Sequence, residues 1–181
     1  MRKSLTTSLS MASVLFAFSV AQAGDVKVAG VHLCCGQCVK IVGKTLKGVK
    51  GVTDVVCDRT AKPKTVSFTA ADDKAAKAGV AALAKAGFHG AAAHGDKKLA
   101  FPKSGAKKGA KADAVTLNGV HLCCGQCVKA IGKLFKEFDG VSSVKCDRKG
   151  RTVVLIGSDI DVSAAVAALN KTGFHGTIKK K

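Results

Sequence analysis

Eight cysteines are the residues of this 181-residue chain whose type and spacing could do chemistry. They divide into two sets of four with matching spacing, and three cysteines of each set are crowded into a short loop. Clustered thiolates bind soft cations such as Cu(I) and Zn(II) in preference to Mg(II) or Ca(II). Adjacent cysteines do not readily bridge, because a disulfide needs a wider Cα separation than neighbours offer. The pattern therefore predicts metal capture rather than a disulfide framework.

The cysteines lie in an internal repeat. The eleven residues GVHLCCGQCVK occur without a change at 30–40 and again at 119–129. Two further motifs recur in the same order, Cys-Asp-Arg at 57–59 and 146–148, and Gly-Phe-His-Gly at 87–90 and 173–176. Each copy has about 65–70 residues, which is near the lower size at which one hydrophobic core is stable by itself. The sequence therefore predicts two copies of one small domain.

Composition divides the chain into four segments. Residues 1–23 have a basic start, a short apolar run and an Ala-x-Ala site, which is typical of a secretory signal peptide cleaved before Gly24. Residues 24–94 and 113–181 are the two expected domains, and the Lys/Ala/Gly-rich residues 95–112 are expected to form a flexible linker. No later segment is apolar enough to span a bilayer. We therefore expect an exported protein, periplasmic or secreted, without stable membrane insertion.

The formal net charge of +18 suits contact with anionic surfaces. Nucleic acid is nevertheless not expected as a partner, because an exported protein rarely meets it and stacking residues are scarce, with eight Phe and neither Trp nor Tyr. Many of the lysines lie in the expected linker, where they are solvated.

Hydrophobic periodicity predicts the same element order in both copies. A strand precedes the cysteine loop and a helix follows it; two strands, a second helix and a short strand complete the copy. This order is β-α-β-β-α-β, the α+β ferredoxin-like arrangement of an antiparallel sheet with two helices on one face. Right-handed crossovers then place the cysteine loop and the Gly-Phe-His-Gly loop at one end of the sheet. We expect Gly51 and Gly140 to end the first helices, and the second helices to open near Asp72 and near Asp159.

The cysteine loop resembles that of the heavy-metal-associated domain, which has Gly-Met-Thr-Cys-x-x-Cys between its first strand and first helix. The matching residues here are 32–38, in which Leu33 takes the place of the methionine, and Cys35 and Cys38 match the metal-binding pair. A cysteine replaces the threonine, so the loop is a Cys-Cys-x-x-Cys variant, and residues 121–127 repeat it. The resemblance implies two metal-capturing domains in tandem and leaves both Zn(II) and Cu(I) open.

Three cysteines of each loop are the expected metal ligands. The loop leads into a helix whose N-terminal dipole and free amides favour thiolate over thiol. Two thiolates suffice for linear Cu(I), whereas three thiolates and a nitrogen suit tetrahedral Zn(II). The expected ligands are Cys34, Cys35, Cys38, Cys123, Cys124 and Cys127, with His32, His89, His121 and His175 as candidate additional ligands.

Other repeated residues are expected in the core. Cysteine on a core-facing strand position behaves as a small hydrophobic side chain. The residues concerned are Cys57, Cys146, Phe88 and Phe174. The side chains of His32 and His121 should point away from the buried leucine beside each of them, toward solvent.

We expect a metal-binding protein, not an enzyme, that captures one thiophilic ion per domain for buffering, detoxification or transfer. The transfer partner would be another thiolate metal-binding protein or a metal transporter. The main alternative is a thiol–disulfide oxidoreductase that uses the two Cys-x-x-Cys pairs. A second alternative is a basic surface-binding protein with incidental thiols. Because the linker would let the two loops meet, one ion held between the domains also stays open.

Overall fold

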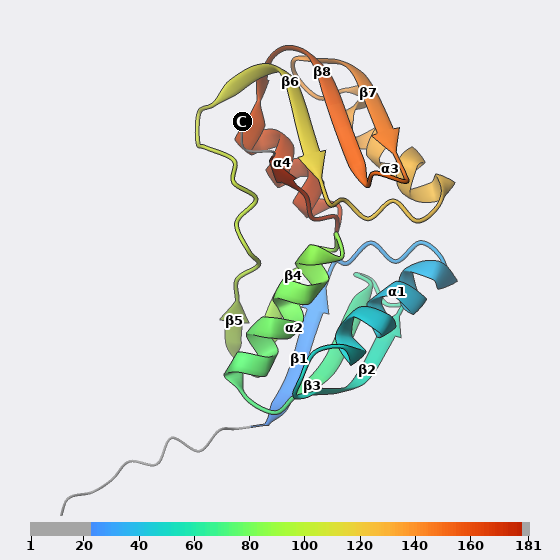
Figure 1. Ribbon diagram of the computed structural model, residues 1–181, viewed down its shortest axis with the longest axis vertical. Helices are drawn as coiled ribbons and strands as arrows, with labels where there is room; N and C mark the ends of the chain where they lie inside the picture. Colours follow the sequence, from blue (N-terminus) through green and yellow to red (C-terminus); the bar gives the residue numbers. More distant parts are fainter. Residues whose placement is uncertain (1–22, 179–181) are drawn as a thin grey trace, which may run out of the picture.

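The computed structural model describes residues 23–178, so the expected signal peptide lies almost wholly outside the described residues. The first domain consists of β1 (Gly24–Ala29), α1 (Gly36–Lys47), β2 (Val52–Asp58), β3 (Thr65–Ala70), α2 (Asp73–Lys85), β4 (Ala91–His94) and β5 (Lys97–Leu99). The second consists of β6 (Lys111–Asn118), α3 (Gly125–Lys136), β7 (Val141–Asp147), β8 (Thr152–Asp161), α4 (Val162–Lys171) and β9 (Thr177–Ile178). Figure 1 shows the two domains one above the other.

Each domain is an antiparallel sheet covered by two helices, which confirms the expected ferredoxin-like class. The strand order is β2-β3-β1-β4-β5 in the first sheet and β7-β8-β6-β9 in the second. The central strand β1 pairs antiparallel with β3 and β4, and β6 pairs in the same way with β8 and β9. Each sheet and its helices enclose a separate hydrophobic core.

Both ends of the expected linker and the ends of the first helices differ from the sequence-based expectation. The expected linker contains β5, which pairs with β4, and the first two residues of β6. The helices α1 and α3 end before Gly51 and Gly140, which instead occupy the following turns with φ of 80° and 78°. A positive φ suits glycine both at a helix end and in a turn, so a glycine alone does not distinguish the two positions.

The second helices begin at aspartate caps. Asp72 accepts a hydrogen bond from the N–H of Ala75 at the start of α2, as expected. In the second domain the cap is Asp161, which accepts from the N–H of Ala164, because β8 continues through Asp159. The expectation for Asp159 was therefore wrong by two residues, and both aspartates are of a type that caps helices well.

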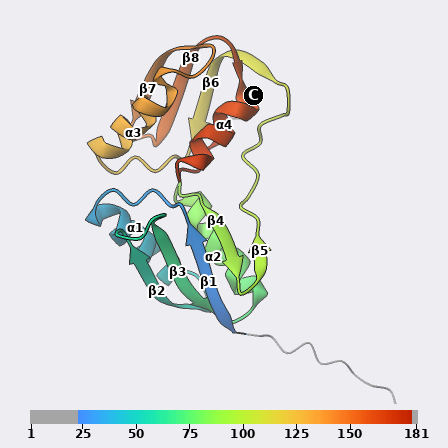
Figure 2. The same cartoon turned by 180° about the vertical axis from the view of Figure 1, so that it is seen from behind.

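The domains meet through the ends of their sheets that carry the cysteine loops. Figure 1 shows the helices of the first domain in front of their sheet, and Figure 2 shows those of the second domain in front of theirs. The two domains therefore face each other as an approximate two-fold pair, in which equivalent loops come into contact. Within residues 23–178, no helix is long and apolar enough to cross a bilayer.

Candidate metal centre

The cysteine loops lie at the start of helices α1 and α3. Cys35 and Cys124 are the residues immediately before these helices, with nearly identical extended backbones. Neither helix has an acidic residue in its first turn, so the positive end of each dipole is not neutralised. The helices end with Lys44 and Lys47 or with Lys133 and Lys136, which complement the negative ends. Both helices therefore direct a positive potential at the thiols.

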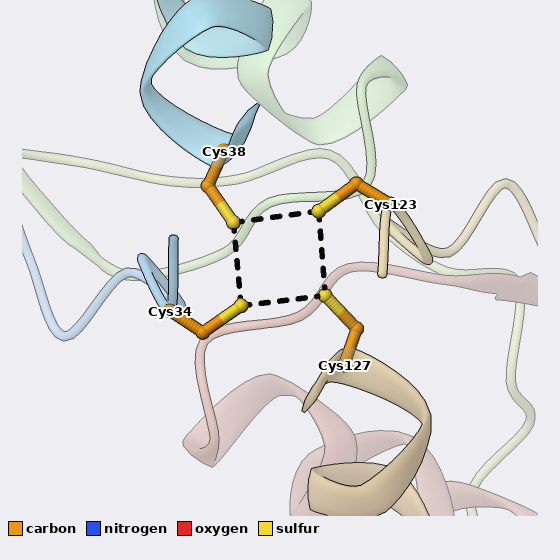
Figure 3. Close-up of side chains that lie close together, drawn as sticks. All are labelled: Cys34, Cys38, Cys123 and Cys127. Carbon is orange, nitrogen blue, oxygen red and sulfur yellow. Dashed lines mark hydrogen bonds between the residues drawn. The ribbon is translucent and has the colours of Figure 1, made fainter. Parts of the chain in front are cut away.

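The structure brings the sulfurs of the two loops into one cluster. Figure 3 shows a ring of four sulfurs. Each sulfur has two neighbours in the ring, one from its own loop and one from the opposite domain. The Sγ–Sγ distances are 3.6 Å for Cys34–Cys38, 3.7 Å for Cys34–Cys127, 3.6 Å for Cys38–Cys123 and 3.6 Å for Cys123–Cys127. The sites were expected one in each domain, whereas the geometry interleaves the thiols of both.

This spacing fits a tetrahedral ion. Sulfur ligands at about 2.3 Å from Zn(II) lie about 3.8 Å from one another in a tetrahedron. All four sulfurs of the ring lie within 4.8 Å of one another, whereas a flat square with these edges would have longer diagonals. The ring is therefore puckered toward a tetrahedron, and the donor set suits a soft cation.

Cys35 and Cys124 complete the cluster. Their sulfurs lie 3.9 Å apart, and the Sγ of Cys35 is 3.8 Å from that of Cys123. The Sγ of Cys124 is 3.6 Å from that of Cys34. All six expected cysteine ligands thus lie together, although they come from loops that are 89 positions apart in the sequence.

Burial divides the six thiols into two kinds. Cys38 and Cys127 are fully buried, whereas the other four cysteines of the cluster are partly exposed. Solvent therefore reaches the four partly exposed thiols but not the buried pair.

The thiols of the cluster do not all ionise easily without a cation. A hydrogen bond from Cys127 lowers the pKa of Cys38, so one thiolate forms readily. The same contact with Cys38, together with burial, raises the pKa of Cys127. Burial and the hydrogen bond with Cys38 likewise raise the pKa of Cys34 to about 12. The first thiolate thus opposes further ionisation through like charge, and a bound cation removes that opposition.

Cys124 shows the effect of the helix start. Burial opposes its ionisation, but hydrogen bonds from the backbone N–H groups of Cys127 and Gln126 help to lower its pKa to about 7. An amide-bonded sulfur at the first turn of a helix is a favourable place for negative charge.

Basic side chains hold the cysteine loops in place. The guanidinium of Arg59 donates to the carbonyl oxygen of Cys34 (3.2 Å), and that of Arg148 donates to the carbonyl oxygen of Cys123 (2.7 Å). Lys64 donates to the carbonyl oxygen of Leu33 (2.8 Å). No role is predicted for these residues from the sequence, although the repeated Cys-Asp-Arg motif is a signal for the two arginines.

The interface itself is built from the Gly-Phe-His-Gly motifs. His175 N–H donates to the carbonyl oxygen of Gly87 (2.8 Å), and His89 N–H donates to that of Gly173 (3.0 Å). A Cβ on Gly87 would overlap the backbone of His121, and one on Gly173 would overlap the backbone of His32. Both glycines also have φ near 90°, so no other residue fits either position.

Aromatic rings interlock reciprocally across this interface. The ring of His32 stacks on Phe174 and that of His121 packs on Phe88, each with a centroid separation of 4.1 Å. Both phenylalanines are fully buried, as expected. The expectation that the two histidines face solvent was wrong: His121 is only 3% exposed, because the opposite domain covers it.

The four candidate histidine ligands occupy two kinds of environment. The Nε2 atoms of His32 and His121 are buried and have no hydrogen-bond partner, and burial lowers the pKa of His32 to about 4. His89 and His175 face each other, with their Nδ1 atoms 3.4 Å apart. Among the described residues, the groups of side chains with metal-binding geometry contain cysteines alone.

Cys57 and Cys146 lie apart from the cluster. Each is partly buried and packs against the core of its own domain. Burial raises the pKa of both thiols, which keeps them neutral. They therefore behave as small apolar side chains.

Residues 116–175 match the model of the heavy-metal-associated domain. The second domain belongs to this family. The first domain has an identical cysteine loop, and its sheet has the equivalent strand order with β5 added at one edge, so it repeats the architecture of the matched domain. The name of the family describes heavy-metal binding, which agrees with the soft donor set of the cluster.

Three solved structures are similar to the chain. Oxidized MerP from Ralstonia metallidurans CH34 is 23% identical, covering 39% of this chain and 100% of its own, with a TM-score of 0.35. The N-terminal soluble domains of Bacillus subtilis CopA are 19% identical, over 88% of this chain and 96% of theirs, with a TM-score of 0.33. The water-soluble region of the P-type ATPase CopA from Bacillus subtilis is 20% identical, over 88% of this chain and 93% of its own, also with a TM-score of 0.33. No curated protein sequence matches the chain.

Proposed function

We propose that this heavy-metal-associated tandem captures a thiophilic divalent ion between its two domains, with thiolates of both cysteine loops as ligands. The observation that carries the proposal is the puckered ring of four sulfurs from Cys34, Cys38, Cys123 and Cys127. Four thiolates at tetrahedral spacing favour Zn(II) over Cu(I), for which two thiolates are sufficient.

The biological role is buffering or transfer of that ion outside the cytoplasm. The signal-peptide pattern of residues 1–23 supports export. Outside the cytoplasm free thiols are prone to oxidation, and coordination to a cation withdraws their reactive electron pairs. A bound ion therefore protects the cysteines that hold it.

Transfer would begin at the partly exposed thiols. Cys34 and Cys123 are the ring members that are partly exposed, so a thiolate of another metal-binding protein or transporter could displace one of them. The basic surface of the chain favours an acidic partner. The buried thiols of Cys38 and Cys127 would be the last to release the ion.

An anaerobic titration of the fully reduced chain with Zn(II), in competition with a chelator of known affinity, tests the proposal. We expect at least one tightly bound equivalent per chain. The double variant Cys38→Ser with Cys127→Ser should lose at least about tenfold in affinity, since thiolate ligands are removed from both domains. The matched control, Cys57→Ser with Cys146→Ser, removes one thiol from each domain outside the cluster and should bind as the wild type does. Absence of any tight equivalent with all thiols reduced would contradict the proposal.

Disulfide exchange is the alternative function. All eight cysteines are free thiols in the structure. An insulin-reduction assay separates the two functions: turnover by the metal-free chain that needs a Cys-x-x-Cys pair would favour an oxidoreductase, and we expect none.

A further inference from the structure

We propose that the six clustered thiols bind two divalent ions in one binuclear centre, in which Cys34 and Cys123 bridge the ions. This inference rests on the proposed function and specifies its coordination. It retains the expected number of ions per chain, one for each domain, but each ion takes ligands from both domains.

Two overlapping groups of four thiols have metal-binding geometry. The inner set is Cys34, Cys38, Cys123 and Cys127, and the outer set is Cys34, Cys35, Cys123 and Cys124. Within each set all sulfurs lie within 4.8 Å of one another. Each set contains two thiols from each domain, so neither set can form in one domain alone.

The number of donors requires sharing. Two tetrahedral ions have eight coordination positions, and six sulfurs are present in the cluster. Both ions can be four-coordinate only when two sulfurs bind both ions. A thiolate has more than one lone pair and can do so, and the sulfurs common to both sets belong to Cys34 and Cys123.

The packing independently singles out the same two residues. Cys34 packs against the core of its own domain and against the core of the second domain, and Cys123 does the same in reverse. Cys35 packs against the first core alone, and Cys124 against the second core alone. Cys34 and Cys123 thus lie at the middle of the domain interface, where a shared ligand must lie.

The electrostatics of the surroundings suit this centre. Six thiolates and two divalent ions leave two negative charges. Arg59 and Arg148 are anchored to the carbonyl groups of Cys34 and Cys123, one guanidinium beside each bridging residue. The N-termini of α1 and α3 add partial positive charge from both sides.

Cadmium tests the proposal, because Cd(II) is a thiophilic analogue of Zn(II) with a spin-active isotope. The test is a titration of the reduced full chain with Cd-113, in which native mass spectrometry counts the bound ions and Cd-113 NMR spectra are then recorded. We expect two ions per chain and two resonances that are split by mutual coupling through the shared sulfurs. One ion per chain, or two resonances without coupling, overturns the binuclear centre but leaves the proposed function standing. No bound ion overturns both.

Single substitutions distinguish shared from separate sites. In the bridged centre Cys34→Ser removes a ligand from both ions, so both resonances should move, and if one ion is lost the resonance of the remaining ion should still move and lose its coupling. In separate sites the same substitution would affect one resonance and leave the other unchanged, which would overturn the proposal. Cys35→Ser with Cys124→Ser removes the outer set alone and should leave one ion in the inner set. The control Cys57→Ser with Cys146→Ser should keep two coupled ions.

Discussion

The Sγ atoms of Cys38 and Cys123 lie 3.6 Å apart although the two residues belong to different domains. A metal ligand set that spans an interface depends on how the domains dock, because a shift of about 1 Å moves half of the ligands away from the other half. The residues that dock the domains therefore matter to metal binding as much as the thiols do.

Gly173→Ala should weaken metal binding without unfolding either domain. The added Cβ overlaps the backbone of His32 in the opposite domain, and such overpacking costs about 1–3 kcal/mol. We expect a loss of roughly 5- to 150-fold in Zn(II) affinity by chelator competition, with an unchanged far-UV circular dichroism spectrum. Gly132→Ala is the matched control, since its Cβ would point into open space, and it should bind normally. Equal affinities of the two variants would show that docking does not set the site.

Docking of the metal-free domains should weaken as the pH falls from about 6.5 to about 4. Burial lowers the pKa of His89 to about 4 in the docked state, and burial also lowers the pKa of His175. Separated domains would leave both imidazoles near the ordinary pKa of about 6.5. The separated state then binds more protons in this window, so the docked state is fully favoured above pH 6.5 and loses stability as the pH falls.

Small-angle scattering of the reduced, metal-free chain measures this effect. The radius of gyration should rise between pH 7.5 and pH 4.5. The variant His89→Gln with His175→Gln should show a smaller rise, leaving the contribution of His32, whose pKa burial also lowers to about 4. A rise of the same size in both proteins would assign the effect to other groups.

Zn(II) uptake should release protons, and affinity should increase with pH. The pKa of Cys34 is raised to about 12, and the pKa values of Cys123 and Cys127 are also raised, so these ligands carry protons at neutral pH. Thiolate binding displaces them. Calorimetry in two buffers of different ionisation enthalpy should give about two or more protons released per chain at pH 7.5. A value near zero would mean that the thiolates already exist in the metal-free protein.

Arg148→Met should lower Zn(II) affinity without changing the number of ions bound. The substitution removes the hydrogen bond to the carbonyl oxygen of Cys123 and one positive charge from the surroundings of the cluster. A hydrogen bond from a charged donor contributes about 1.5–3 kcal/mol before solvent exposure is considered, so we expect roughly a tenfold loss at this exposed residue. Lys149→Met changes charge equally at the neighbouring position and serves as the control. A larger effect at Lys149 would point to net charge rather than loop positioning.

His121→Phe should leave the visible spectrum of the Co(II)-loaded chain unchanged. The groups of described side chains with metal-binding geometry contain only cysteines, and a phenyl ring retains the stacking on Phe88. Loss of an imidazole ligand would shift the d–d bands of tetrahedral Co(II), so a shift would identify His121 as a ligand. The same measurement on His32→Phe tests its counterpart on Phe174.

The sequence alone determined the parts of this protein that depend on local pattern. The repeated cysteine loop, its place before a helix and the β-α-β-β-α-β order follow from spacing, periodicity and turn residues, all of which act over short distances. Phe88 and Phe174 could likewise be assigned to buried positions. Where local signals were degenerate the assignments failed, as for Asp159 and Asp161, since either aspartate can cap a helix.

The tertiary structure alone decided that the two loops share one cluster. Docking depends on surfaces that match only after both domains have folded, such as the space left by Gly87 and Gly173 for the opposite backbone. No periodicity in the sequence encodes that match, and the pattern of each loop by itself therefore predicts His32 and His121 in solvent. The number of cysteines in each loop came from the sequence, whereas their arrangement around common positions came from the contact between the domains.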